Sequence, residues 1–384
     1  MRKIRTGVIG CGKVGHFHAQ AYQKLPNSEF TAVCNHNIGR AQEFAEQYGV
    51  RAFASIREMV EETGVEAVSI CTPHPAHASQ AVEAAQCGLH VMIEKPLASS
   101  LEDCDAILAA VREAGVVGSV LCQRRFYPGS QRIRRAIEEG RLGRPILGTV
   151  NMLGWRDMDY YHSDPWRGTW KGEGGGVLVN QAVHQLDLLL WMMGEVEEVY
   201  GRWDTMNHPG LEVEDTAVAV IRFRSGALGS IVASNSQNPA LFGKVCVHGS
   251  NGATAGIKTD GGAMFIAGVS SVTEPPLNDV WTVPGEEDML EQWNREDTAL
   301  FEAVDATTYF HTLELQDFLD AIGTGRSPQV TLEDGRRAVE LFTAIYRSQR
   351  DGRPVKFPLR PEYGTDFDGR LAAGPGRCGK GENT

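Results

Sequence analysis

The chain has 384 residues, of which 42% are hydrophobic and 22% charged, fractions typical of a globular protein with room for two domains. Its net charge of −12 disfavours nonspecific binding to nucleic acid, whose phosphates repel an acidic protein. No apolar run is long enough to cross a membrane and no signal-peptide core precedes the first strand, so we expect a cytoplasmic protein with no membrane partner. The eight cysteines include no CxxC pair, so we expect no disulfide framework and no zinc site.

The motif that organises the N-terminal half follows an apolar run at residues 4–9. It reads Gly10-Cys11-Gly12-Lys13-Val14-Gly15, a complete GxGxxG, and a helical pattern begins at residue 14. In such a strand–turn–helix unit the first glycine permits a tight turn, the second lets a pyrophosphate approach the backbone, and the third lets helix and strand pack closely. The alternative is an ordinary tight turn. We predict a dinucleotide site that includes Gly10, Gly12, Lys13 and Val14.

The first third of the chain alternates apolar strand patterns with helical patterns. Strands are predicted at 4–9, 30–34, 66–71, 89–93 and 117–122. Helices are predicted at 14–25, 38–48, 55–63, 76–87 and 100–114. Short apolar strands joined by crossover helices indicate a doubly wound parallel sheet, so we predict an α/β protein with an N-terminal Rossmann domain over residues 1–124.

The strand patterns change character after residue 145, where they alternate or cluster β-branched residues. Strands are predicted at 148–155, 197–203, 216–224, 227–234, 244–249 and 354–358, and helices at 130–140, 177–193, 306–323 and 333–350. Consecutive strands of this kind indicate a C-terminal α+β domain over residues 125–360 with an open, largely antiparallel sheet. The acidic, proline-containing stretch 271–298 is predicted to be an exposed loop, and the Gly-rich stretch 361–384 a disordered tail.

The end of the second predicted strand bears on the choice between NAD and NADP. Dinucleotide folds commonly place an acidic residue about 20 positions past the glycines to bind the adenosine ribose. Here the strand leads to Asn35-His36-Asn37, without an acid. Asn35 can bond a hydroxyl without repelling a 2′-phosphate, and His36 or Arg40 could pair with such a phosphate. Either cofactor is therefore compatible with the sequence.

Two further motifs follow apolar strands and are expected at the carboxyl edge of the sheet, where ligands bind in open α/β folds. They are the stretch 71–77, Cys-Thr-Pro-His-Pro-Ala-His, and Glu94-Lys95-Pro96. Lys95 is a candidate for a substrate hydroxyl or carbonyl, with a solvated lysine as the alternative. The histidines near these motifs lack metal-ligand spacing, so we expect no metal. The residues expected to line the cofactor are Thr72, Pro73, His74, His77, Glu94, Lys95 and Gln123.

A third group of candidates lies in the second domain, after Gly174-Gly175-Gly176. In the apolar helix that ends at Gly194, Asn180, His184 and Asp187 recur at i, i+4 and i+7 and share one stripe. Polar groups on an apolar helix are costly to bury unless they are paired or face a polar cavity. The alternative is that His184 is a hydrogen-bonded core histidine. The aromatic and arginine-rich span 155–167 could cover and bond a sugar ring, or could pack a domain interface.

These motifs, together with Arg125-Phe126-Tyr127-Pro128, resemble the Gfo/Idh/MocA family of nicotinamide-dependent sugar and cyclitol oxidoreductases over residues 3–358. The resemblance implies that Lys95 contacts the reacting hydroxyl and the cofactor, and that His184 is the acid/base. Many members carry an aspartate four residues before that histidine, where this chain has Asn180. The resemblance also implies a homodimer or homotetramer.

We therefore expect an NAD(P)-dependent dehydrogenase or reductase that passes a hydride between nicotinamide and a secondary carbon of a sugar, glycoside or inositol. An imidazole with a pKa of about 6.5 can accept the hydroxyl proton near neutral pH, and a lysine can stabilise the developing alkoxide. Two alternatives are a glycosidase that retains NAD and a non-catalytic dinucleotide-binding regulator. The expected substrate-binding residues are Lys95, Arg125, Tyr161, Arg167, Asn180 and His184.

Overall fold

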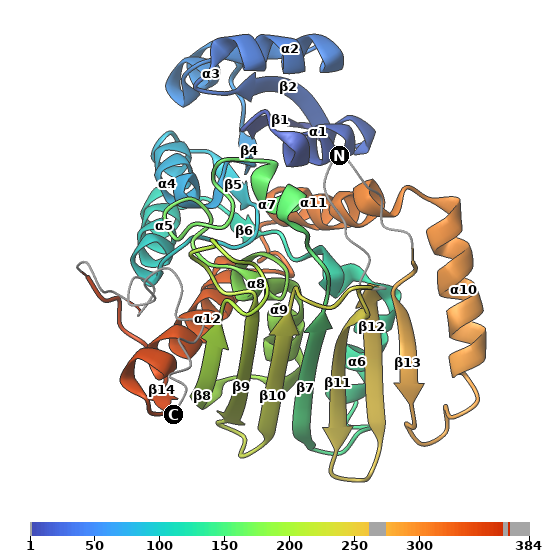
Figure 1. Cartoon of the computed structure of the whole chain (residues 1–384). Coiled ribbons are helices and arrows are strands. Elements are labelled where there is room, and N and C mark those ends of the chain that lie inside the picture. Colours follow the sequence, from blue (N-terminus) through green and yellow to red (C-terminus); the bar gives the residue numbers. More distant parts are fainter. Residues whose placement is uncertain (1, 261–273, 364–367, 369–384) are drawn as a thin grey trace, which may run out of the picture. The chain divides into compact units, whose positions relative to one another are not determined.

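The computed structural model describes residues 2–260, 274–363 and 368, which form two compact units (Figure 1). Unit 1 holds residues 2–126 and 304–336, and unit 2 holds most of the rest. Unit 1 thus takes in a segment that the sequence analysis places in the second domain. The predicted disordered tail lies outside the described residues, except for 361–363 and 368. No helix in the described part of the chain is long and apolar enough to cross a membrane.

Unit 1 contains a six-stranded sheet in the order β3-β2-β1-β4-β5-β6, and every neighbouring pair is parallel. This order reverses direction between β1 and β4, which is the arrangement of a dinucleotide-binding doubly wound sheet. The predicted Rossmann fold is therefore confirmed, and its sequence prediction missed only the short β3. The strands are β1 Ile4–Ile9, β2 Ser28–Cys34, β3 Arg51–Phe53, β4 Ala67–Ile70, β5 His90–Ile93 and β6 Gly118–Val120.

The crossover helices of unit 1 begin and end at recognisable caps. Side-chain oxygens of Asn37, Ser55 and Ser100 accept backbone N–H groups at the starts of α2, α3 and α5, as N-caps do. These helices end at glycines in the left-handed region. The helices are α1 Lys13–Lys24, α2 Ile38–Tyr48, α3 Ile56–Thr63, α4 His77–Gln86 and α5 Leu101–Ala114, with 3₁₀ turns η1 His74–Ala76 and η2 Gln123–Phe126.

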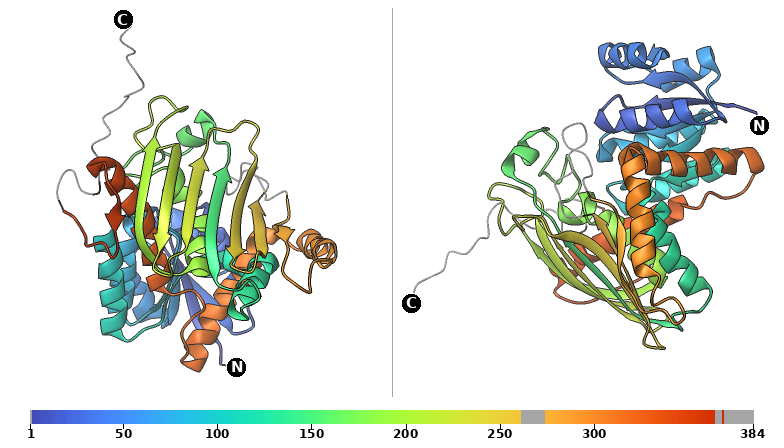
Figure 2. Two further views of the ribbon diagram at one scale, coloured as in Figure 1. Left: turned by 90° about the horizontal axis from the view of Figure 1, so that it is seen from below. Right: turned by 90° about the vertical axis from the view of Figure 1, so that its right-hand side faces the viewer.

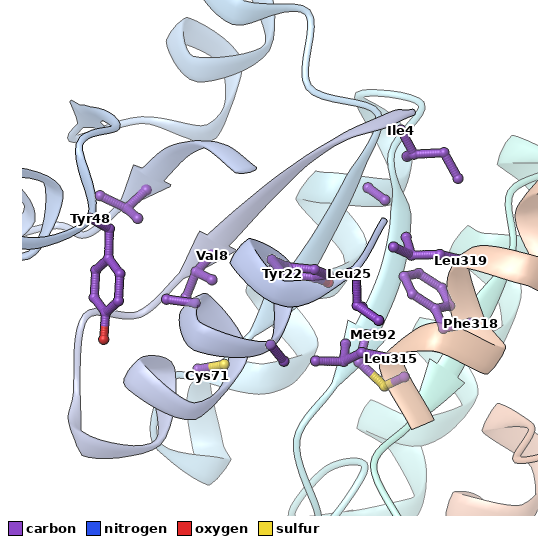
Figure 3. Packing of buried hydrophobic residues seen from close by; sticks show 14 of the residues in the cluster. Ile4, Val8, Tyr22, Leu25, Tyr48, Cys71, Met92, Leu315, Phe318 and Leu319 are labelled. Carbon is purple, nitrogen blue, oxygen red and sulfur yellow. The ribbon is translucent and has the colours of Figure 1, made fainter. Parts of the chain in front are cut away.

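A helix from late in the chain, α11 (Ala306–Thr324), also belongs to unit 1. Its Leu315 and Phe318 are buried in one cluster with Tyr22 of α1 and with Met92 of β5, as Figure 3 shows. Burying such side chains stabilises the unit by roughly 1.5–3 kcal/mol each relative to leaving them exposed. α11 therefore covers α1 and helps to hold it against the sheet.

Unit 2 contains an eight-stranded sheet in the order β13-β12-β11-β7-β10-β9-β8-β14. β7 and β10 are parallel and the other neighbouring pairs are antiparallel, which confirms the predicted, largely antiparallel sheet. Helices lie along one face, as Figure 2 shows. The strands are β7 Pro145–Leu153, β8 Val196–Asp204, β9 Thr216–Phe223, β10 Leu228–Ser234, β11 Phe242–Gly249, β12 Thr254–Asp260, β13 Leu277–Trp281 and β14 Val355–Lys356.

The helices of unit 2 include two that the sequence analysis missed, a short one at Met158–His162 and a longer one at Leu290–Ala303. The helices of this unit are α6 Pro128–Glu138, α7 Met158–His162, α8 Val177–Asn180, α9 Val183–Met193 and α10 Leu290–Ala303, and α12 (Leu332–Asp351) begins in unit 1 and continues into unit 2. The prediction of an exposed loop over 271–298 is wrong for its described residues, which include β13 and most of α10. Trp293 packs on Trp281 at 5.0 Å, and Arg132 pairs with Asp297 at 2.6 Å. Because of these contacts with distant parts of the chain, the stretch forms a strand and a helix although its acidic composition is typical of an exposed loop.

Candidate active site

The turn between β1 and α1 has the geometry that a dinucleotide phosphate requires. Gly10 has φ +103°, and a Cβ there would lie 2.7 Å from the backbone of Cys71. A Cβ on Gly15 would lie 2.5 Å from the carbonyl oxygen of Gly10. In contrast, apart from its two chain neighbours, no described residue has a heavy atom within 4 Å of a Cβ built on Gly12, the N-cap of α1, and that helix has no side-chain cap. The open backbone and the uncapped N–H groups fit an anionic pyrophosphate.

The side chains after β2 form a local turn. Asn35 accepts the N–H of Asn37 on Oδ1 at 2.9 Å, and Asn37 in turn caps α2 by accepting the N–H of Arg40 at 3.2 Å. His36 and the side chain of Arg40 are exposed. No carboxylate follows this strand, so the site lacks the group that would repel a 2′-phosphate.

The loop after β4 is tied to the loop after β5 through a histidine. His77 is fully buried, and its ring nitrogens lie 2.9 Å from the carbonyl oxygens of Thr72 and Pro96. His74 is also buried, in η1. His77 thus joins these two loops at the carboxyl edge of the sheet, and its predicted contact with the cofactor remains a prediction.

Glu94 and Lys95 directly follow β5. The buried Glu94 carboxylate lies 3.0 Å from Nε2 of His18 with one oxygen, and with the other accepts the backbone N–H of Lys95 at 3.1 Å. Burial would raise the pKa of Glu94, but the His18 hydrogen bond and nearby positive charge, including that of Lys95, hold it at about 2. Lys95 itself is half-buried. An ionised carboxylate therefore lies beneath the Lys95 loop.

A histidine that the sequence analysis did not single out joins this group. Nε2 of His311, on α11, lies 4.0 Å from Glu94 Oε1. One ligand atom each from His18, Glu94 and His311 lies within 4.8 Å of the others, the one such group of three among the described residues. The residues are far apart in sequence, so no spacing rule could have identified them.

Gln123 and Arg125 lie in the 3₁₀ turn η2, after β6. Arg125 is buried and pairs with Asp334 at 3.2 Å, within unit 1. Burial would raise the pKa of Asp334, but the positive charge of Arg125 outweighs that effect and lowers it. Arg125 is thus held by a protein carboxylate. Its predicted role in substrate binding remains a prediction.

The last glycine of the triplet in unit 2, Gly176, is explained by a buried glutamate that the sequence did not reveal. A Cβ on Gly176 would lie 1.8 Å from the carbonyl oxygen of Glu214. The Glu214 carboxylate accepts the N–H groups of Gly176 at 2.9 Å and Leu178 at 3.0 Å, and the Tyr346 hydroxyl at 2.9 Å. Only glycine allows this close approach, which fixes the start of α8.

The predicted continuous helix over 177–193 is wrong, because the chain breaks between α8 and α9 at residues 181–182. Asn180 ends α8, whereas His184 and Asp187 lie on α9. The N–H of Ala182 bonds the carbonyl of Val177 at 2.7 Å, which departs from regular α-helical spacing. The three polar residues therefore do not form a stripe on one helix.

Tyr160 is the hub of a polar network in unit 2. Its hydroxyl lies 2.5 Å from Nη1 of Arg167, 3.1 Å from Nδ2 of Asn180 and 3.0 Å from Nε2 of Gln181. Asn180 also donates to Glu173. The structure thus brings together Arg167 and Asn180, both predicted substrate-binding residues, through a tyrosine that was not selected.

The predicted residue Tyr161 has a separate environment. It is buried, and its hydroxyl accepts a hydrogen bond from Asn235 at 3.2 Å. Its ring lies at 5.2 Å and 62° to that of His208. Burial raises the pKa of Tyr161 far above its ordinary value, so its hydroxyl stays protonated.

Comparisons with known proteins cover nearly the whole chain. The profile of an oxidoreductase family with an NAD-binding Rossmann fold matches residues 4–121, and that of its C-terminal alpha/beta domain matches residues 134–357. Scyllo-inositol 2-dehydrogenase (NAD(+)) of Bacillus subtilis is 28% identical over 94% of this chain and 98% of its own. Myo-inositol 2-dehydrogenase of Thermotoga maritima is 28% identical over 92% and 98%. The structure of the WlbA dehydrogenase of Bordetella pertussis, complexed with NADH and UDP-GlcNAcA, is 34% identical over 94% of this chain and 99% of its own, with a TM-score of 0.81.

Proposed function

The chain belongs to the Gfo/Idh/MocA family of oxidoreductases, and we propose that it passes a hydride between NAD(H) and a ring secondary carbon of a sugar, glycoside or inositol. The observation that carries this proposal is the turn after β1. Gly12 leaves the backbone open, and the uncapped first turn of α1 offers N–H groups to a pyrophosphate. The names of the inositol dehydrogenases that it resembles support the substrate class.

Two residues are proposed to carry out the chemistry. His184 takes the hydroxyl proton on a ring nitrogen, and the ammonium of Lys95 stabilises the negative charge that develops on the hydroxyl oxygen. A bound nicotinamide supplies the hydride acceptor. In the reverse direction the same residues protonate the carbonyl oxygen as it is reduced. Arg167 and Asn180, joined through Tyr160, bind substrate hydroxyls in this proposal.

The proposed cofactor is NAD rather than NADP. The solved relative was complexed with NADH, and the inositol dehydrogenase of Bacillus subtilis is named for NAD(+). The turn after β2 uses Asn35 and Asn37 for local hydrogen bonds. An exposed Arg40 is the group that could instead attract a 2′-phosphate. Measuring kcat/KM for both cofactors, in the natural protein and in Arg40→Ala, tests this choice: a preference for NADP that Arg40→Ala removes would overturn it.

A nucleotide-linked sugar acid is a second candidate substrate, and a specific side chain favours it. Arg156 is buried, and its Nε has no hydrogen-bond partner in the described chain. Its guanidinium and that of Arg167 lie 5.3 and 4.3 Å from the ring of Tyr160. A carboxylate would satisfy this buried cation. Comparing inositols, neutral sugars and UDP-linked uronic acids decides between the classes, since loss of rate in Arg156→Ala confined to acidic substrates would select the second.

We also propose a homo-oligomer that forms through the helix-free face of the sheet in unit 2. Val218, Val220 and Leu228 are exposed large apolar residues on adjacent strands of this face. Contiguous exposed apolar residues commonly mark an interface.

A reducing cytoplasm remains the proposed location, in keeping with seven described cysteines that are all free thiols.

The two alternative activities make different predictions for the same assay. A glycosidase that retains NAD would hydrolyse a glycoside without accumulating reduced cofactor. A regulator would bind dinucleotide but turn over no polyol. Net growth of reduced nicotinamide with a polyol would favour the dehydrogenase over both.

A further inference from the structure

A chain of buried polar side chains runs through unit 1 to the Lys95 loop. The hydroxyl of Tyr22 lies 2.7 Å from Ser69 Oγ, which lies 2.9 Å from Nδ1 of His18. Nε2 of His18 then lies 3.0 Å from the Glu94 carboxylate, whose second oxygen accepts the Lys95 N–H. The chain thus links α1, β4 and the end of β5. α1 is also the helix whose N-terminus is proposed to hold the cofactor phosphates.

The protons in this chain can be placed from chemistry. An ionised Glu94 accepts only, so His18 donates from Nε2, and in the neutral ring Nδ1 accepts the Ser69 hydroxyl proton. Ser69 can then accept from Tyr22, because burial raises the pKa of that phenol and keeps its proton in place. Each hydrogen-bond donor named here therefore faces an acceptor, and each acceptor faces a donor. A fully satisfied buried network of this sort fixes a single arrangement.

His311 completes the surroundings of Glu94. Its Nδ1 donates to the carbonyl oxygen of Thr307 at 2.5 Å, which leaves Nε2 facing Glu94. Burial lowers the pKa of His311 to about 4, so this ring is neutral near pH 7. Of the groups that lower the pKa of Glu94, the His18 hydrogen bond has the largest effect and the charge of Lys95 a smaller one. A divalent metal ion in this cluster would have to displace that hydrogen bond beside an existing cation, so the geometry favours a hydrogen-bonded anchor.

We propose that Glu94 and His18 are positioning residues that fix Lys95 relative to the phosphate-binding helix α1. The proposal rests on the proposed function, because it assigns the purpose of this anchor to the catalytic role of Lys95. If Glu94 acts by positioning Lys95, then Glu94 contributes to turnover only through Lys95, and that contribution disappears when Lys95 is absent.

A double-mutant cycle tests this consequence. Glu94→Gln should lower kcat about 10- to 100-fold, because displacing the Lys95 ammonium by about 1 Å reduces the rate by roughly that factor. The KM for NAD should change less than about threefold. In a Lys95→Ala background the same substitution should leave the residual rate unchanged. An equal fall in both backgrounds would overturn the proposal. His248→Gln, on β11 and bonded to Thr254, is the matched control and should leave kcat unchanged.

A second readout does not depend on turnover. Reductive ¹³C-methylation labels lysine amines, and loss of one NMR signal in Lys95→Arg identifies that residue. Its signal should move in Glu94→Gln and His18→Gln but not in His248→Gln, and an unmoved signal would overturn the proposal even if no polyol is turned over. One equivalent of metal in the purified protein, lost in His18→Gln, would also overturn it, because the cluster would then be a metal centre.

Discussion

Arg167 donates a hydrogen bond to the Tyr160 hydroxyl at 2.5 Å while its guanidinium lies 4.3 Å from the centre of the same ring. The two residues thus interact both through the hydroxyl and through the ring face. Asn180 reaches the same hydroxyl. The hydroxyl oxygen of the buried Tyr160 is therefore a shared hydrogen-bond partner of two substrate-site candidates, Arg167 and Asn180.

Tyr160→Phe should therefore weaken both stability and activity. The partly buried donors of Arg167 and Asn180 and the buried donor of Gln181 lose their shared acceptor, which should lower the free energy of unfolding by about 1–3 kcal/mol. We expect kcat/KM for the polyol to fall about tenfold or more, because misoriented contacts weaken transition-state binding. Urea unfolding and steady-state kinetics check these results. Tyr161→Phe, which loses one bond to Asn235, should have the smaller kinetic effect, and the reverse order would contradict the account.

The pair of His208 and Asp215 should make stability depend on pH. His208 Nδ1 lies 2.8 Å from the Asp215 carboxylate and Nε2 lies 2.6 Å from the carbonyl oxygen of Arg156, so both ring nitrogens face acceptors. Burial lowers the pKa of His208, but these hydrogen bonds outweigh it and the pKa is raised. Its contribution is therefore fully present below about pH 6.5 and is lost as the pH rises through the raised pKa.

Asp215 acts in the opposite direction. Burial would raise its pKa, but hydrogen bonds from His208 and from backbone N–H groups hold it at about 2, so its contribution is present above about pH 4 and is lost as the pH falls toward 2. Denaturant unfolding from pH 3 to 9 checks both signs. His208→Gln should flatten the loss of stability above about pH 6.5, and an unchanged slope in that variant would contradict the assignment.

Gly176→Ala should be among the most damaging single-methyl substitutions in unit 2. The added Cβ would lie 1.8 Å from the backbone oxygen of Glu214, which cannot rotate away as a side chain would. We expect a loss of about 3 kcal/mol or more in the free energy of unfolding. Gly323→Ala is the control, because within the described residues its added Cβ on α11 meets no atom within 4 Å apart from its chain neighbours and its own helix backbone. It should be neutral or stabilising by about 0.5–1 kcal/mol. Equal losses in the two variants would contradict this account of the glycine stretch.

Val220→Lys should dissociate the proposed oligomer. Val220 is 60% exposed on the helix-free face, and a charge buried there without a partner would be costly. Sedimentation velocity should show a smaller species for this variant at the same concentration. Met206→Lys, in a loop and 64% exposed, is the control and should leave the assembly size unchanged. A natural protein that sediments as a monomer would refute the proposed interface.

The features predicted well from sequence are those with local causes. The glycines after β1 and the alternating strands of β9 and β10 leave patterns within ten residues, so the two sheets could be predicted. Contacts between distant segments leave no such pattern. His311 lies near Glu94 although its helix comes more than 200 residues later in the chain. Similarly, Trp293 of α10 packs against Trp281 of β13, and the residues around Trp293 do not reveal this contact. The start of α8 likewise depends on Glu214, which accepts the N–H groups of Gly176 and Leu178 from about 36 residues later in the chain.

The most direct test of the account is the growth of reduced-nicotinamide absorbance when the purified protein is given NAD and a panel of inositols, sugars and UDP-linked sugar acids. Growth is expected with at least one polyol. The rate should fall about 100-fold or more in both Lys95→Ala and His184→Ala, since removing a group that acts in the transition state lowers kcat. No growth with any polyol, or full turnover in either variant, would contradict the account.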